Sequence, residues 1–174
     1  FVKIEEFNQA SSEELTTLLK HCVHIQRWSD EILSQRPFVN TQVLMDFAKA
    51  QASTWTWLEI ANALATHPRI GEKKAQAMLS EKEQAFSHQE QSAIKQSTET
   101  QHALLQGNIA YEKKFGHIFL IRAMGLDQTE ILQALKYRLL NDPETEQRIV
   151  KQQLGEIAML RLNQELSENE SLND

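Results

Sequence analysis

The sequence predicts an all-α fold, and three observations support this prediction. Its 174 residues include only five glycines and three prolines, so few positions interrupt a helix. No stretch alternates apolar and polar residues for long, as a half-buried strand would. Several segments instead repeat apolar residues three and four positions apart, which is the spacing of one helix face.

Length and composition predict one domain with a real core. A chain of this size with 41% hydrophobic and 24% charged residues is ordinary for a globular protein that buries a core. We expect one helical domain of about eight helices over residues 1–166. The polar and acidic residues 167–174 predict a disordered tail.

Capping residues and breakers divide the first part of the chain into four predicted helices. Ser11 and Glu14 form a capping box that opens a helix ending near His21. A short helix over 29–34 is expected to end before Arg36-Pro37-Phe38, which we interpret as a helix stop. Two more helices are predicted over 41–52 and 54–66. The second carries apolar residues at helical spacing that predict a core-facing stripe: Trp57, Leu58, Ala61, Leu64 and Ala65.

The middle of the chain predicts a short and then a long helical region. The short piece covers residues 73–79, and Ser80 opens the long region. We expect a break near Gly107-Asn108, because glycine is a poor helix former, and a further helical piece over 108–115 that ends near Gly116.

The last part of the chain predicts two capped helices. Phe119-Leu120-Ile121 is the only β-like run, and it is too isolated to predict a sheet. Asp127 and Glu130 cap a helix that runs to about Leu140. Asp142-Pro143 places a cap residue before a proline at the first helical position, so it starts the last helix.

Charge and cysteine content exclude several classes of protein. A net charge of −6 argues against nucleic-acid binding, although a locally positive pocket can still accept an anionic substrate. The single Cys22 cannot form an internal disulfide and indicates a reducing compartment.

No apolar run approaches the roughly 20 residues that span a bilayer, so no membrane association is expected. Neither a secretory signal nor a peroxisomal Ser-Lys-Leu ending is visible, so we expect a cytoplasmic protein.

The strongest chemical signal is the segment His67-Pro68-Arg69-Ile70-Gly71. Proline pushes the preceding residue out of the α region, so His67 is expected at a helix end, where its imidazole can point into a cleft. Ser80 with Glu83 predicts the first turn of a helix, whose free N–H groups and partial positive charge suit an anionic ligand. Together they predict a small-molecule site that contains an acid–base group.

Each of these residues also has a structural interpretation. A histidine before proline is more often a turn or packing residue than a catalytic one. Capping-box geometry accounts equally well for Glu83, and Gln84 could be a solvated helix residue. Tyr111-x-x-x-Phe115-Gly116 is interpreted as an aromatic packing turn.

Arg161 lies among apolar residues, in Met159-Leu160-Arg161-Leu162. A guanidinium in such a place needs a carboxylate partner or a ligand, although reaching out to solvent is the default interpretation.

The sequence predicts neither a metal site nor an organic cofactor. His21 and His24 lie three apart, but no second cluster of ligands accompanies them. Glu99-x-x-His102 is the single Glu-x-x-His of the chain, whereas a di-iron carboxylate bundle needs two. No glycine-rich phosphate loop, Cys-x-x-Cys motif or nucleophile elbow occurs.

In this order the motifs resemble those of the 2-oxo-4-hydroxy-4-carboxy-5-ureidoimidazoline (OHCU) decarboxylase family. The resemblance covers nearly the whole chain, and the His67 block is similar to the bacterial version of that motif. The blocks are Trp28 with Arg36-Pro37-Phe38, His67-Pro68-Arg69-Ile70-Gly71, Ser80-x-x-Glu83-Gln84, Asn108-x-x-Tyr111-x-x-x-Phe115-Gly116, Phe119-Leu120-Ile121-Arg122-Ala123, Glu130-Ile131-Leu132 and Ile157-Ala158-x-x-Arg161-Leu162.

The resemblance implies an all-helical, commonly homodimeric enzyme that needs no metal or organic cofactor. Such an enzyme converts OHCU to (S)-allantoin and carbon dioxide in urate degradation. Matched motif by motif, His67 becomes the catalytic acid–base residue. The residues implied to line the substrate site are Pro68, Ser80, Glu81, Lys82, Glu83, Gln84, Phe119, Leu120, Ile121, Arg122 and Ala123.

Chemistry assigns further roles within that implied site. We expect Glu83 to orient His67 or the substrate N–H groups, and Gln84 to bind the ureido or ring amide. Arg161 is the candidate for holding the substrate carboxylate through a bidentate pair. His67 and Glu83 could exchange the roles of proton donor and orienting residue.

The alternative function is a catalytically silent helical binding or scaffold protein of the same fold. The joint presence of His67, Glu83 and Gln84 argues against it, since a scaffold has no need for all three at two helix ends.

Overall fold

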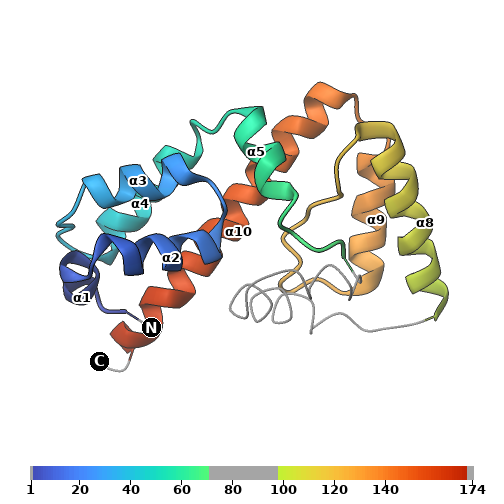
Figure 1. Cartoon of the computed structure of the whole chain (residues 1–174). Helices are drawn as coiled ribbons and strands as arrows, with labels where there is room; N and C mark the ends of the chain where they lie inside the picture. The colour runs from blue at the N-terminus through green and yellow to red at the C-terminus, as the bar shows by residue number, and fades with distance from the viewer. Residues whose placement is uncertain (1, 71–97, 172–174) are drawn as a thin grey trace. The chain divides into compact units, whose positions relative to one another are not determined.

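The computed structural model describes residues 2–70 and 98–171, with side chains up to Leu166. Within these ranges it contains eight helices and no strand, which confirms the predicted all-α fold (Figure 1). Contacts divide the chain into two compact units, described separately below. The first comprises the described residues up to Ile60 and those from Gly155, and the second comprises the described residues of 61–154.

The first unit is built from four complete helices and parts of two others. Its helices are α1 (Ile4–Gln9), α2 (Ser12–Cys22), α3 (Gln26–Ser34), α4 (Thr41–Ala52), the first part of α5 (Trp57–Leu64) and the end of α10 (Pro143–Ser171). The predicted start of α2 is confirmed, since the Ser11 side chain accepts a hydrogen bond from the Glu14 N–H at 3.1 Å. The bounds of α4 agree with the prediction. The six-residue helix α1 was not predicted, and it has no side-chain cap that the sequence could have signalled.

Two tryptophans organise the core of this unit. Trp28 is fully buried and donates from Nε1 to the Ala48 carbonyl at 3.1 Å. Its ring meets that of Trp55 edge-on at a centroid distance of 6.4 Å. Trp55 in turn donates to Gln51 Oε1 at 2.9 Å, so both indole N–H groups are satisfied inside the core. This arrangement ties α3 to α4.

The predicted helix stop Arg36-Pro37-Phe38 also closes another helix. The Arg36 guanidinium donates to the Phe7 carbonyl at 3.2 Å and to the Ala10 carbonyl at 2.6 Å, at the end of α1. Asn8 exchanges two hydrogen bonds with the Phe38 backbone, at 2.7 and 2.8 Å. The segment therefore satisfies carbonyls that a helix end leaves free, in agreement with its structural interpretation.

The start of α5 contains an ion pair with a clear acid dependence. Arg27 donates to both carboxylate oxygens of Glu59 at 3.0 Å, and Glu59 also accepts from the Thr56 N–H at 2.9 Å. The hydrogen bond from Arg27 is the main reason that the pKa of Glu59 falls to about 2. Because this value lies below the roughly 4.3 of an unfolded glutamate, the pair stabilises the fold above that pH and stops doing so as the pH falls towards 2.

We therefore expect Arg27→Gln to lower the melting temperature at neutral pH by a small amount, since solvent screens the pair. The difference from the unmodified protein should narrow between about pH 5 and pH 2 as Glu59 becomes protonated in both proteins. Thermal unfolding followed by circular dichroism measures it. Arg148→Gln is the matched control, because the exposed Arg148 lies 3.6 Å from Glu144 and donates to Thr145 Oγ1 at 3.4 Å, and it is not among the groups that lower the pKa of Glu59. A difference that stays constant with pH would show that Glu59 does not respond to Arg27.

The predicted apolar stripe of α5 is wrong in part. Leu58 is 71% exposed and Ala65 is also exposed, whereas the buried residues are Ile60, Ala63 and Leu64. The helix carries apolar residues on more than one face, so helical spacing alone could not identify the face that packs.

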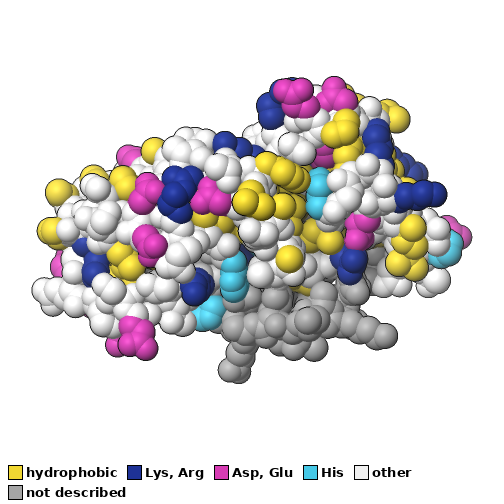
Figure 2. Space-filling model, turned by 45° about the horizontal axis from the view of Figure 1, so that its top comes forward, with side chains coloured by type: hydrophobic (Ala, Val, Ile, Leu, Met, Phe, Trp, Pro, Cys, Tyr) yellow, Lys and Arg dark blue, Asp and Glu magenta, His cyan; other side chains and the backbone are white. Residues whose placement is uncertain are grey.

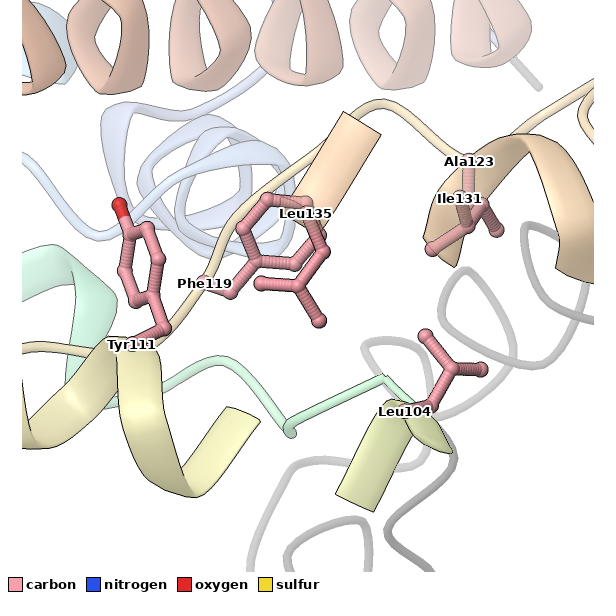
Figure 3. Close-up of a cluster of buried hydrophobic side chains, with 6 residues drawn as sticks. All are labelled: Leu104, Tyr111, Phe119, Ala123, Ile131 and Leu135. Carbon is pink, nitrogen blue, oxygen red and sulfur yellow. The ribbon is translucent and has the colours of Figure 1, made fainter. Parts of the chain in front are cut away.

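The second unit contains α8 (Thr98–Phe115), α9 (Gln128–Arg138) and the beginning of α10. A cluster of buried side chains joins α8, α9 and the irregular segment that connects them (Figure 3). Its members are Leu104, Tyr111, Phe119, Ala123, Ile131 and Leu135. Both starts predicted here are confirmed: Asp127 and Glu130 form a capping box, and Pro143 follows Asp142 as the first residue of α10.

The predicted break at Gly107-Asn108 is wrong, because α8 continues through both residues. A Cβ atom on Gly107 would lie 2.5 Å from Leu135 Cδ2, so the glycine allows α8 and α9 to approach closely. Gly116 does end α8, as predicted. Its φ of +81° is the left-handed conformation that glycine adopts after a helix, and its N–H donates to the Glu112 carbonyl at 2.8 Å.

Gly107 and Gly155 offer a matched pair of substitutions with opposite expected signs. Gly107→Ala should destabilise the protein by about 1–3 kcal/mol, because the fully buried Leu135 has to move. Gly155→Ala should stabilise it by about 0.5–1 kcal/mol, because nothing lies within 4 Å of the added methyl group and alanine is the better helix former. Urea unfolding of both variants measures the two changes. A neutral Gly107→Ala would mean that Leu135 adjusts freely.

The last helix extends into the predicted tail. We expected disorder from Ser167, whereas the backbone of α10 is helical through Ser171. Of the helices in the described part of the chain, none combines the length and apolar character that crossing a bilayer requires. Figure 2 shows basic side chains interspersed with acidic ones on the face that it presents.

Candidate active site

His67 lies in the turn that follows α5, as its position before proline predicted. The His67 N–H donates to the Leu64 carbonyl at 3.1 Å, which closes the end of the helix. The imidazole is half-buried, and Pro68 beside it is buried. The backbone N–H of His67 thus closes the turn, and the ring nitrogens of its imidazole are the groups of interest for proton transfer.

A bidentate ion pair attaches this turn to α8. Arg69 donates to Glu112 from Nε at 2.7 Å and from Nη2 at 2.8 Å. The two side chains are 44% and 25% exposed, so the pair adds little stability, but its two parallel hydrogen bonds fix an orientation. The turn that carries His67 is therefore held at a defined place along α8.

The segment from Phe119 to Ala123, which the resemblance implies to line the substrate site, has no regular secondary structure. Some of its side chains are buried and others are accessible. Phe119, Leu120 and Ala123 are buried, and two of them belong to the apolar cluster. Ile121 is half-buried and Arg122 is exposed. Since these three side chains serve the core and Ile121 also packs against it, the segment offers a ligand mainly its backbone groups and the exposed Arg122 side chain.

A buried polar network lies against this segment. Arg138 donates from Nε to Glu146 Oε1 at 2.7 Å, and its Nη2 lies 2.6 Å from the same oxygen. Tyr111 donates its hydroxyl to Glu146 Oε1 at 2.5 Å, and Asn141 donates to Oε2 at 3.1 Å. The Glu146 carboxylate, which is fully buried, thus has partners on both oxygens.

Tyr111 takes part in both the apolar cluster and the polar network. Its ring packs against Phe115 at 4.6 Å and Phe119 at 5.3 Å, which agrees with the predicted aromatic packing turn. Its hydroxyl points away from the apolar side chains of the cluster (Figure 3). Burial, with the hydrogen bond to Glu146, raises the pKa of Tyr111 well above its usual value, so the phenol stays protonated and donates.

The network was missed at the level of sequence. Arg138 stands in the last turn of α9 and Glu146 in the first turn of α10, where the helix dipole already explains one basic and one acidic residue. Tyr111, which stands in a family motif, is the one member that the sequence marks, and the motif does not show that its hydroxyl binds a buried carboxylate.

Arg161 is 4% exposed and lies on α10 in the unit that contains α2. Its Nη1 donates to the Cys22 carbonyl at 3.4 Å. The default interpretation, in which its side chain reaches out to solvent, is therefore wrong. A role for Arg161 in binding a carboxylate stays a prediction.

The predicted site residues Ser80, Glu81, Lys82, Glu83 and Gln84 lie outside the described residues. Among the side chains that the structure does describe, no group of three or more His, Cys, Asp or Glu residues could hold a metal ion.

Comparison with known proteins shows which family this chain resembles. The family model described as OHCU decarboxylase matches residues 8–163. "Uric acid degradation bifunctional protein TTL" of Arabidopsis thaliana is 29% identical over 154 residues, which are 82% of this chain and 44% of that protein. "Uric acid degradation bifunctional protein" of Bacillus sp. (strain TB-90) is 25% identical over 172 residues, 98% of this chain and 33% of that protein. The chain thus spans less than half the length of these two relatives.

Two solved structures share the fold. One is a crystal structure of OHCU decarboxylase in the presence of (S)-allantoin, with a TM-score of 0.71, 24% identity and coverage of 91% of this chain and 99% of that one. The other is a crystal structure of (S)-allantoin synthase, with a TM-score of 0.65, 18% identity and coverage of 95% and 54%. With its helical fold, its His67 turn and a family match over residues 8–163, this chain belongs to the OHCU decarboxylase family.

Proposed function

We propose that this chain decarboxylates OHCU to (S)-allantoin and carbon dioxide in urate degradation, without metal or organic cofactor. The observation that carries the proposal is the family match over residues 8–163, which includes the His67 turn and the segment from Phe119 to Ala123. The half-buried imidazole at the end of α5 supports it, because the reaction needs a proton donor held at one place.

The chemistry sets three requirements. The bond between the ring carbon and the carboxyl group breaks, carbon dioxide leaves, and the electron pair is left with the ring. The pair moves into the adjacent ring C=N system, the hydroxyl-bearing carbon becomes the ring carbonyl of allantoin as its hydroxyl proton is lost, and a proton is added to the neighbouring carbon that carries the ureido group. The protein has to orient the carboxylate, hold the ring and deliver the proton to one face.

The residues are assigned to these tasks by their chemistry. His67 interacts with the substrate hydroxyl and transfers the proton, since an imidazole titrates near neutral pH. Glu83 orients His67 or binds the ring N–H groups, and Gln84 binds the ureido or ring amide. Arg161 holds the carboxylate, and backbone groups of the segment from Phe119 to Ala123 complete the polar contacts.

The test is the circular dichroism of allantoin formed from freshly generated OHCU, with and without the protein. Decarboxylation in water gives racemic allantoin, so rapid appearance of the (S) enantiomer alone is the expected result. A slow racemic product equal to the blank would favour the catalytically silent binding protein. Thermal protection by allantoin would then test binding, because a ligand of the native state raises its stability.

The resemblance further supports a cytoplasmic homodimer that acts on this small molecule and binds neither nucleic acid nor membrane. Sedimentation at several protein concentrations tests the dimer. A species of 20.0 kDa at every concentration would contradict it.

A further inference from the structure

We propose that the buried pair Arg138–Glu146 is a positioning device that holds the backbone from Phe119 to Ala123 in the conformation that binds substrate. This inference rests on the proposed function, because it assigns a task to that segment. Arg138 lies in the last turn of α9 and Glu146 in the first turn of α10, and the family resemblance assigns neither residue to the substrate site.

The segment depends on side chains for its shape. It lies outside any helix, so no regular pattern of hydrogen bonds fixes its backbone. Its Leu120 carbonyl accepts from Arg138 Nη1 at 2.7 Å, and its Arg122 N–H donates to Gln153 Oε1 at 2.8 Å. The first hydrogen bond comes from Arg138 at the end of α9, and the second comes from Gln153 on α10. They fix backbone groups of the segment that lie two residues apart.

Arg138 makes a second contact with the segment, through the Phe119 ring. The centre of its guanidinium lies 4.5 Å from the centroid of the Phe119 ring, within the range of a cation–π contact. One planar group thus orients a side chain and the next carbonyl together. The same guanidinium is oriented by Glu146, which in turn is held by Tyr111 and Asn141.

Stability alone is a poor reason for such a network. Removing two charges from water is costly, and apolar residues of similar volume often stabilise a core as well as a buried ion pair does. A buried ion pair is better suited to specifying one arrangement of the groups around it. Here the group that it specifies is the Leu120 carbonyl, in the segment that the family resemblance assigns to substrate binding.

Arg138→Lys is the most direct test. A lysine keeps the positive charge beside Glu146, but its ammonium lacks the planar fork that reaches the carboxylate and the Leu120 carbonyl together. We expect kcat/KM for OHCU to fall at least tenfold while the far-ultraviolet circular dichroism is unchanged. Amide hydrogen exchange should accelerate in peptides that cover residues 118–123 and stay the same in α4.

Leu44→Ala is the control for loss of stability. Leu44 is fully buried on α4 in the first unit, whereas the segment belongs to the second, so truncation of Leu44 lowers the melting temperature through the core of the first unit. Below its melting transition this variant should keep the kinetics and the exchange pattern of the unmodified protein. An equal loss of kcat/KM in Leu44→Ala, or unchanged kinetics and exchange in Arg138→Lys, would overturn the positioning role.

Gln153→Leu supplies a milder second variant, in case Arg138→Lys does not fold. It removes the acceptor for the Arg122 N–H, so it should accelerate exchange in the same peptides by a smaller factor. Unchanged exchange would count against the proposal. If the unmodified protein did not decarboxylate OHCU, the proposed function would fail, and hydrogen exchange would still decide whether Arg138 holds the segment.

Discussion

His67→Asn is expected to abolish stereospecific allantoin formation while the fold remains intact. Asparagine has a similar size and still forms hydrogen bonds, but it cannot accept and release a proton near neutral pH. Loss of a general acid–base group typically costs a factor of about 10²–10⁴ in rate. Any allantoin that still forms should be racemic. The measurement is kcat/KM from the circular dichroism of the product.

The geometry explains why the fold should survive this change. The turn is closed by the His67 backbone N–H and attached to α8 through Arg69 and Glu112, and neither contact uses the imidazole. The melting temperature should therefore change little. His102→Asn is the matched control, because His102 is exposed on α8 and has no assigned role. A large fall in melting temperature would make His67 a structural residue, and retained turnover would remove it from the reaction.

Much of the fold could be predicted because local chemistry marks helix ends. Ser11, Asp127 and Gly116 each perform the capping or terminating role that their residue type predicts. These signals act over a few residues, so one sequence is enough to detect them.

What could not be predicted depends on contacts between distant residues. Gly107 is the residue type that interrupts helices, yet it lies within a continuous helix, where it makes room for Leu135 of α9. In α5, apolar residues on several faces left the packed face undecided, and Leu58 proved exposed. Tertiary packing overrides propensity in both places.

The candidate site shows the same division. The position of His67 at a helix end follows from the proline after it, which is a local effect. The residues that hold the neighbouring segment, Arg138 and Glu146, come from two helices and are ordinary helix-end residues in sequence. A buried network of this kind becomes visible only when the folded chain brings its members together.

Arg161→Lys is expected to weaken substrate binding more than it slows the chemical step. Two parallel hydrogen bonds from a guanidinium match the two oxygens of a carboxylate, and an ammonium cannot reproduce them. A hydrogen bond to a charged group contributes about 1.5–3 kcal/mol, so KM should rise about tenfold or more. Steady-state kinetics with OHCU give the change in KM separately from that in kcat.

Arg148→Lys on the same helix is the matched control. Arg148 is exposed, so the kinetics of this variant should equal those of the unmodified protein. The buried position of Arg161 and its hydrogen bond to the Cys22 carbonyl give the experiment a second readout. A purely structural Arg161 would lower the melting temperature on substitution and leave KM unchanged below the transition. A raised KM in a variant that melts normally would instead place the guanidinium on the substrate, since lost packing alone leaves no reason for weaker binding.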